Sequence, residues 1–228
     1  MTAVSYSELK TRIHERGYTS IAIEGNIGVG KTSLARLMIK RLRGRLIEEN
    51  VEDNPFLERF YDDMGAYAFQ TQLVFLMNRY KQQLALSQHD LFDDLIVLDY
   101  IFARDRIFAH VNLSDDELAL YERVATELEA KLIKPDLVMY LQASSNVLFD
   151  RIQLRGKDFE RAISRDYLEA LNDAFNHYFF NYSAGPLLVV NTDAVDFVND
   201  ERHFSDLIQR IAEPVVNTEF YVPSWETK

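Results

Sequence analysis

The sequence contains no cysteine among its 228 residues. Disulfide bonds, thiolate catalysis and cysteine-ligated zinc sites are therefore excluded. Glycine and proline are scarce, with 8 and 5 copies, which argues against long flexible linkers. The length is sufficient for one α/β domain with a substantial core. We expect a single domain over residues 1–228, with a lead-in at 1–18 and a tail at 213–228 that contains Trp225.

Long apolar runs and an excess of basic charge are also missing. The longest stretch without Asp, Glu, Lys or Arg, residues 174–192, is interrupted by asparagine, histidine, glycine and proline and predicts no membrane span. The first residues have no apolar core of the signal-peptide type. The formal net charge of −11 argues against binding to nucleic acid polymers or anionic membranes. We expect a cytoplasmic protein.

What the chain does contain is an alternation of short apolar segments with longer amphipathic ones. The apolar segments predict strands at 19–24, 45–48, 95–99, 137–141 and 187–190. The amphipathic segments predict helices at 32–43, 67–86, 114–132, 147–154, 167–179 and 204–211. This order predicts an α/β fold with a central parallel sheet of about five strands flanked by helices. In such sheets ligands bind beyond the carboxyl ends of the strands.

The most specific motif lies between the first predicted strand and the first predicted helix. It fits the phosphate-loop pattern G-x-x-x-x-G-K-[ST], which predicts a P-loop fold that binds a nucleoside triphosphate but leaves the reaction open. Backbone N–H groups and a helix N-terminus would hold a triphosphate, Lys31 would contact its β- and γ-phosphates, and Thr32 would bind Mg²⁺. The alternative is a glycine-rich turn with a chance lysine. The predicted ATP-binding residues here are Gly25, Asn26, Ile27, Gly28, Val29, Gly30, Lys31, Thr32 and Ser33.

Two acids follow the second and third predicted strands. Glu49 and Asp99 should open into the cleft beside the phosphate loop. A carboxylate that accepts a proton suits Glu49, and one that helps to hold Mg²⁺ suits Asp99. The alternative for Glu49 is a solvated acid, because Glu48, Glu52 and Asp53 crowd the same loop.

A basic segment stands out against the acidic background. Residues 151–165 carry five basic and two acidic side chains, a net charge of +3, so the remainder of the chain carries −14. Arg151 and Arg155 share a helix face, and Gly156 then ends the pattern. We interpret this segment as a short basic lid that closes on phosphates. The alternative is a salt-bridged surface face.

Together these motifs resemble the deoxynucleoside kinase family, and more closely its bacterial deoxyadenosine/deoxyguanosine kinase branch, over residues 20–211. The sequence IEGNIGVGKTSL is similar to the family's phosphate loop, and ENVEDNPFL to the segment that begins with its catalytic glutamate. The resemblance implies that Glu49 deprotonates the 5′-hydroxyl of the acceptor. It also implies that Lys31, Arg151 and Arg155 act in catalysis and that Lys157 belongs to the lid that binds ATP.

The resemblance further implies an acceptor site. Gln70 in the sequence AFQT falls on the glutamine that contacts the nucleobase, with Met77 seven residues later. Tyr61 and Glu160 fall where the family holds the sugar 3′-hydroxyl. Asp105 is either a contact to an exocyclic amine or a surface acid paired with Arg104 or Arg106. In related folds the loop after the last strand borders the adenine of ATP, which makes Phe197 a candidate for stacking.

One departure from the family pattern follows the third predicted strand. Where D/E-R-S is frequent in the family, this chain has Asp99-Tyr100-Ile101, so the arginine that contacts the 5′ side of the substrate is missing. Arg104 or Arg106 are candidates to replace it.

The resulting hypothesis is an ATP- and Mg²⁺-dependent kinase for the 5′-hydroxyl of a deoxynucleoside, in nucleotide salvage. Deoxyadenosine is the first choice of acceptor, followed by deoxyguanosine or deoxycytidine. The alternatives are a nucleoside monophosphate kinase and a catalytically inactive nucleotide-binding regulatory protein. Family resemblance implies a homodimer with the helices at 67–86 and 114–132 at the interface.

Overall fold

The computed structural model describes residues 4–87, 95–130, 132, 134–193 and 195–223, and in this part of the chain six parallel strands form one sheet. The strand order is β2-β3-β1-β4-β5-β6. The prediction of a parallel α/β sheet is confirmed, with one strand more than expected. The strands are β1 (Ser20–Gly25), β2 (Arg45–Ile47), β3 (Ile96–Leu98), β4 (Leu137–Gln142), β5 (Leu187–Asn191) and β6 (Thr218–Phe220).

The additional strand and an additional helix lie in the predicted tail and lead-in. β6 pairs with β5 in the register Leu187↔Thr218, and three residues are too few to show a strand pattern in the sequence. The helix α1 (Tyr6–Glu15) is capped by Ser5, whose side chain accepts a hydrogen bond from the backbone N–H of Glu8. Trp225 lies outside the described residues.

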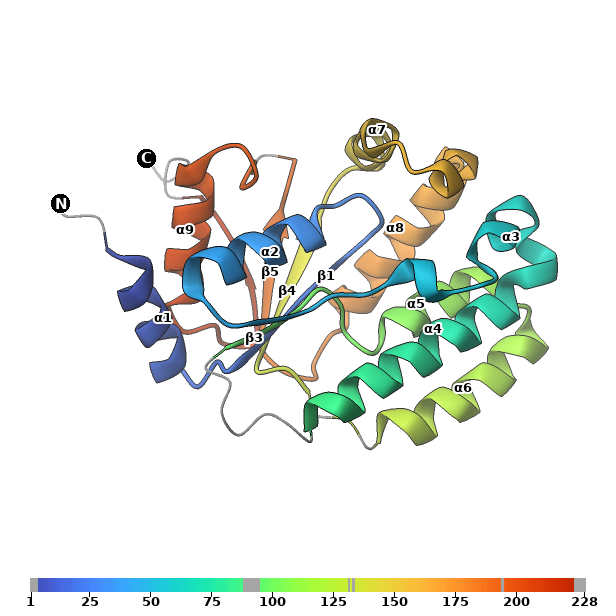
Figure 1. The fold of residues 1–228 in the computed structure, drawn as a ribbon, viewed down its shortest axis with the longest axis horizontal. Coiled ribbons are helices and arrows are strands. Elements are labelled where there is room, and N and C mark those ends of the chain that lie inside the picture. The colour runs from blue at the N-terminus through green and yellow to red at the C-terminus, as the bar shows by residue number, and fades with distance from the viewer. Residues whose placement is uncertain (1–3, 88–94, 131, 133, 194, 224–228) are drawn as a thin grey trace.

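Helices cover both faces of the sheet (Figure 1). α1, α2 and α9 lie on one side of it, and α4, α5, α6 and α8 lie on the other. The remaining helices are α2 (Lys31–Leu42), α3 (Leu57–Asp62), α4 (Met64–Ser87), α5 (Arg104–Asn112), α6 (Asp115–Glu129), α7 (Ser145–Arg155), α8 (Arg165–Phe180) and α9 (Glu201–Ile211), with short 3₁₀ turns η1 (Val51–Asp53) and η2 (Asp158–Ala162).

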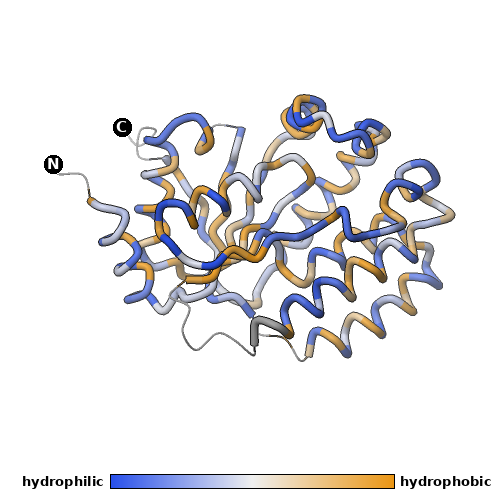
Figure 2. Tube along the Cα trace, viewed as in Figure 1, coloured by the Kyte–Doolittle hydropathy of each residue, from blue (hydrophilic) through white to orange (hydrophobic). Residues whose placement is uncertain are grey.

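The central strands are buried on both faces, and their residues alternate between two cores. Ile21 and Ile23 of β1 pack in the core beneath α1, α2 and α9. Ala22 of the same strand packs with Phe175 of α8 in the opposite core. Figure 2 shows the consequence as mainly hydrophobic strands between helices that alternate in hydropathy. This two-sided burial explains why the strands read as apolar runs rather than as alternating patterns.

The long helix α4 separates an apolar face from a polar one. Its predicted apolar stripe is confirmed, because Leu76 and the partly buried Phe69 and Leu73 pack with Phe102 and Tyr121 of the neighbouring segments. A different face of α4 is thereby turned toward the carboxyl end of the sheet. No helix among the described residues combines the length and the apolar composition that a membrane span needs.

Candidate active site

Two cavities meet at the segment Gly25–Thr32, which we call the phosphate loop. The wide cavity, about 750 Å³, lies between the phosphate loop, α7 and residues 192, 193 and 195–199, which follow β5. The narrow cavity, about 340 Å³, is enclosed by the phosphate loop, α3, α4, α5 and the segment 155–160. Gly28, Lys31, Thr32, Ser33 and Arg155 line both. A group held on the phosphate loop is therefore open to two separate compartments.

The phosphate loop has the conformation that the motif predicts. β1 ends at Gly25 and α2 begins at Lys31, with Gly30 at its N-cap in the left-handed region (φ 105°). A Cβ atom at Gly25 would lie 2.4 Å from the carbonyl oxygen of Leu141, so only glycine fits beside β4. Asn26 is buried and its Nδ2 donates to the carbonyl of Leu168 (3.1 Å), so it anchors the loop to α8 rather than lining a cavity.

Lys31 is folded back over the phosphate loop. Its Nζ donates to the carbonyl oxygens of Gly25 and Asn26, both at 2.9 Å. Burial and the neighbouring Arg104 guanidinium lower the pKa of Lys31 to about 7, against the opposing effect of nearby carboxylates. A bound triphosphate would supply the negative charge that this buried amine lacks.

Asp99 and Thr32 lie together, as the predicted metal site requires. Thr32 Oγ1 donates to Asp99 Oδ2 at 2.8 Å, and the backbone N–H of Glu49 donates to Asp99 Oδ1 at 2.9 Å. Burial raises the pKa of Asp99 above its ordinary value. A hydroxyl and a carboxylate are the hard oxygen donors that Mg²⁺ takes beside phosphate oxygens. Within the described ranges no group of three or more His, Asp or Glu side chains forms a further metal site.

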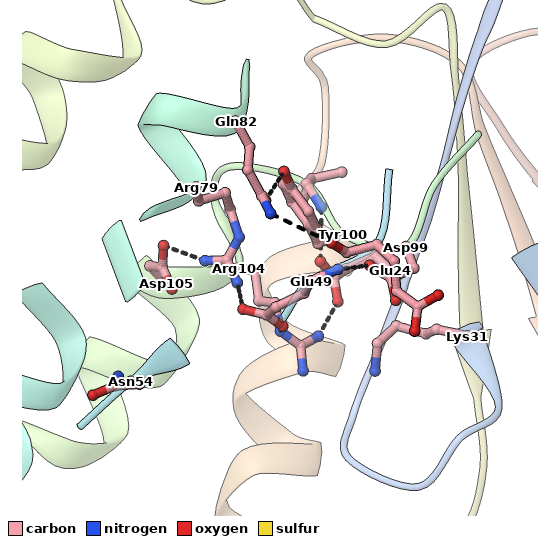
Figure 3. Close-up of polar contacts among 12 residues, drawn as sticks. Glu24, Lys31, Glu49, Asn54, Arg79, Gln82, Asp99, Tyr100, Arg104 and Asp105 are labelled. Carbon is pink, nitrogen blue, oxygen red and sulfur yellow. Dashed lines mark hydrogen bonds and ion pairs between the residues drawn. The ribbon is translucent and has the colours of Figure 1, made fainter. Parts of the chain in front are cut away.

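Glu49 lies between cations in the narrow cavity (Figure 3). Its carboxylate forms ion pairs with Arg79 of α4 and, at 3.6 Å, with Nε of Arg104 of α5. Burial by itself would raise the pKa of Glu49, but Arg79, Arg104 and Lys31 together hold it below its ordinary value. A partly buried, ionised carboxylate, 17% exposed, therefore lies at the phosphate loop, and the alternative of a solvated acid is wrong.

Arg104, rather than Arg106, reaches the site. It is buried, pairs with Glu24, and donates to the carbonyl oxygen of Gly25 at 3.0 Å. Arg106 instead pairs with Glu122 and Glu129 of α6, away from both cavities. The cation that the sequence lacks at position 100 is thus supplied from the first turn of α5.

Asp105 is buried and forms an ion pair with Arg79 at the inner end of the narrow cavity. The expectation of a surface acid paired with Arg104 or Arg106 is therefore wrong. Burial raises the pKa of Asp105 to about 6, although Arg79 opposes this shift. Gln72 and Thr71 line the same end, and in the part of the chain that the structure describes Gln72 Oε1 and Thr71 Oγ1 have no hydrogen-bond partner. Unpaired polar atoms of this kind are available to a polar ligand.

Two predicted residues of α4 face away from the site. Gln70 is exposed and Met77 is 39% exposed, and neither lines a cavity. The two lie seven residues apart and so share one helix face, as expected, but this face points outward. The predicted glutamine is therefore wrong by two positions: Gln72, not Gln70, lines the narrow cavity, on the same helix face as Phe75 and Arg79.

The predicted lid spans the mouth of the narrow cavity. Arg155 Nε donates to Glu160 Oε2 at 2.9 Å, and Lys157 Nζ lies 3.6 Å from Glu52 Oε1 of η1. The Tyr61 ring stacks on Phe159 with 6.1 Å between centroids. Tyr61, Lys157 and Glu160 all line the narrow cavity, so Lys157 lies on the side opposite to the one that the resemblance implied.

Arg151 and Phe197, both predicted to contact ATP, line the wide cavity. Arg151 donates to the carbonyl oxygen of Thr192 at 2.9 Å and to that of Val29 at 3.3 Å, which ties the phosphate loop to the loop after β5. The Phe197 ring is buried, and its Cζ would lie 3.3 Å from a Cβ atom at Gly30.

Besides Gln72, two charged residues of the site, Arg79 and Glu24, were not found by sequence reasoning. Arg79 lies seven residues after Gln72 on the same helix face, which would have been a signal if Gln72 had been chosen. Glu24 is fully buried and accepts from the backbone N–H of Gly25 (2.8 Å) and of Ile101 (2.9 Å). Its signal was an acid at the end of an apolar strand.

Comparison with known proteins agrees with this geometry. The deoxynucleoside kinase family matches residues 21–217. The deoxyguanosine kinase of Bacillus subtilis is 36% identical over 201 residues, covering 86% of this chain and 97% of that protein. The deoxyadenosine/deoxycytidine kinase of the same organism is 27% identical over 202 residues, covering 86% and 92%.

Solved structures give the same result. Deoxyadenosine kinase from M. mycoides with bound dATP superposes with a TM-score of 0.74 at 27% identity, covering 84% of this chain and 97% of that chain. The same enzyme with bound dCTP gives a TM-score of 0.72 at 29% identity, with the same coverage. The family match spans residues 21–217, most of the chain, and the chain therefore belongs to the deoxynucleoside kinase family and is a phosphotransferase.

Proposed function

We propose that this enzyme transfers the γ-phosphoryl group of ATP to the 5′-hydroxyl of a purine deoxynucleoside in nucleotide salvage, with the whole chain acting as one domain. The observation that carries the proposal is the pair of cavities that share the phosphate loop, with Glu49 in only one of them. A donor in the wide cavity and an acceptor in the narrow cavity would meet at Lys31.

The inner end of the narrow cavity supports a purine base. Gln72 offers a paired donor and acceptor, and Asp105 offers a carboxylate acceptor for the exocyclic amine of adenine. This favours deoxyadenosine. Arg79 adds donors that suit the carbonyl oxygen of guanine, and the similarity to a deoxyguanosine kinase makes deoxyguanosine the second candidate. Deoxycytidine, with an exocyclic amine of its own, is the third.

The chemistry rests on positioning and charge. Glu49 is held ionised and accepts the proton of the 5′-hydroxyl, while Lys31, Arg104 and Arg155 surround the position where negative charge develops. Tyr61 and Glu160 line the cavity between the base end and the phosphate loop, which suits contacts to the sugar. Arg151 and Phe197 contribute to the donor site.

Thr32 and Asp99 are the residues that would hold Mg²⁺. The ion would neutralise charge on the β- and γ-phosphates. Asp99 Oδ1 accepts a hydrogen bond from the backbone N–H of Glu49, while Oδ2 accepts one from Thr32. Asp99 therefore fixes the position of the base as well as contributing to the metal site.

We also propose a cytoplasmic homodimer. The pair α4 and α6 forms the outer layer on one side of the molecule, and Met77 and Leu120 are large apolar side chains exposed on it. A dimer that covers this surface would bury both.

The test is an assay of ADP release with the four deoxynucleosides and their monophosphates. We expect turnover with deoxyadenosine or deoxyguanosine, and a kcat lowered by ~10²-fold or more when Glu49 is replaced by glutamine. Turnover with monophosphates alone would favour a nucleoside monophosphate kinase, although Arg79 and Arg104 are already paired with acids. Nucleotide binding without turnover on any acceptor would favour a regulatory protein.

A further inference from the structure

The residue that replaces the missing arginine, Tyr100, is fully buried and has polar partners. Its hydroxyl donates to Gln82 Oε1 of α4 at 2.7 Å. The Arg79 guanidinium lies over its ring, 4.7 Å from the centroid, a distance typical of a cation–π contact. Figure 3 shows Tyr100 beside Arg79 and Gln82, with Glu49 below the Arg79 guanidinium and Asp105 on its opposite side. A buried tyrosine hydroxyl usually has a hydrogen-bond partner, so the contact with Arg79 is what distinguishes Tyr100 from a core tyrosine such as Tyr140.

Both contacts lead to Glu49 by separate routes. Through its ring, Tyr100 supports Arg79, which pairs with the Glu49 carboxylate. Through its hydroxyl, Tyr100 holds Gln82, whose Nε2 donates to the carbonyl oxygen of Glu48 at 3.4 Å. The side chain of Glu49 and the backbone just before it are therefore restrained by one residue.

We propose that Tyr100 is a positioning residue for Glu49, which it restrains through Arg79 and through Gln82. The cation that would otherwise occupy this position is supplied by Arg104, whose Nε lies 3.6 Å from Glu49. In this chain the two tasks are divided: Arg104 provides charge at the 5′ end of the narrow cavity, and Tyr100 provides rigidity. The inference rests on the proposed function, because it assigns Glu49 as the base.

The experiment compares two tyrosine-to-phenylalanine variants. Tyr140 of β4 is the matched control, because it is also buried and its hydroxyl also donates to a carboxamide oxygen, that of Asn176, at 2.8 Å. We expect Tyr100→Phe to lower kcat by ~3- to 10-fold and to change KM for ATP by less than ~2-fold, because a displaced base slows chemistry but not donor binding. Tyr140→Phe should leave kcat unchanged at a similar loss of thermal stability.

Two further variants sharpen the result. Gln82→Met should lower kcat at least as much as Tyr100→Phe, and the double variant should be no slower than Gln82→Met alone, because Gln82→Met already removes the hydrogen bonds to Tyr100 and to Glu48. Tyr100→Leu, which also removes the ring, should lower kcat further, by ~10- to 100-fold. Should that variant fail to fold, the comparison of Tyr100→Phe with Tyr140→Phe still decides the question.

A second measurement does not depend on turnover. The Nε–Hε NMR signal of Arg79, assigned by its loss in Arg79→Lys, should be sharp in the wild type and broadened when Tyr100 is replaced by leucine. Equal kcat values for Tyr100→Phe and Tyr140→Phe, with an unchanged Arg79 signal, would overturn the inference. If the wild type phosphorylated no deoxynucleoside, the proposed function would fail, while the Arg79 signal would still test whether Tyr100 restrains Arg79.

Discussion

The two cavities are built from different kinds of sequence information. The wide cavity is lined by the phosphate loop, by α7 and by the loop after β5, and its position follows from one contiguous motif. The narrow cavity is assembled from α3, α4, α5 and the lid, and its polar groups come from positions far apart in the chain. A phosphate site can therefore be found from a local sequence pattern. The residues of an acceptor site can be named only when it is known which face of each helix turns inward.

We expect the largest effect from replacing Lys31 in the phosphate loop, which both cavities share. Lys31→Ala should reduce turnover by ~10³-fold or more, since the variant lacks the cation at the transferred phosphoryl group. Steady-state ADP release measures the loss, and a thermal melt checks the fold. Lys10→Ala, in α1, which lines neither cavity, serves as the control. Normal activity of Lys31→Ala would mean that this loop is not the phosphate site.

The second largest effect is expected from Glu49, which lines only the narrow cavity. Glu49→Gln should lower kcat by ~10²-fold or more without unfolding the protein, because the amide cannot accept the proton. ATP binding, measured by calorimetry, should change little, since Glu49 does not line the wide cavity. A variant with nearly normal kcat would remove Glu49 from the mechanism.

A smaller effect, on KM for the deoxynucleoside, should distinguish the two glutamines of α4. Gln72→Leu should raise KM for the deoxynucleoside by ~10-fold or more, because a paired base contact is worth ~1–3 kcal/mol. Gln70→Leu is the matched control on the exposed face of the same helix and should leave KM unchanged. A raised KM for Gln70→Leu with an unchanged KM for Gln72→Leu would instead assign the base contact to Gln70, as the sequence resemblance implied.

The dependence on pH tests Asp105. Its pKa in the folded protein, about 6, lies above the ordinary value, so the carboxylate is ionised above pH 6 and becomes protonated as pH falls through this value. If the ionised form accepts the amine of adenine, KM for deoxyadenosine should rise by up to ~10-fold per pH unit below that point. Asp105→Asn should abolish the change in this window. A flat KM profile in the wild type would show that the carboxylate does not contact the base.

The smallest effect concerns the proton on Lys31. Since its pKa is lowered to about 7 in the free protein, ATP binding at pH 8 to 9 should be accompanied by uptake of up to ~1 proton as the phosphates stabilise the charged amine. Calorimetry in buffers of different ionisation enthalpy measures the uptake. Lys31→Arg, charged at every pH used, should show none. Equal proton uptake by the wild type and Lys31→Arg would show that a group other than Lys31 takes up the proton.

Most of the fold could be predicted because the strands are apolar on both faces and the helices are amphipathic. The exceptions were α1, α3, α5 and β6, which lie in short or mixed segments that need the rest of the sheet to hold them. In the site, Glu49, Asp99 and Thr32 were predictable because they follow strands or the loop motif directly. Gln72 was not, because Gln70 and Gln72 differ by two positions on one helix, and only packing decides which of them faces inward.

The sequence by itself determined the phosphate loop, the parallel sheet and the acids at the ends of its strands. These features depend on contacts close in the chain and on the common direction of parallel strands. Only the tertiary structure decided that Arg79 joins Glu49 to Asp105, that Arg104 replaces the cation missing at Tyr100, and that Lys157 faces the narrow cavity. The physical reason is burial: charges from separate elements can be held beside one another away from water only when the complete fold supplies their partners.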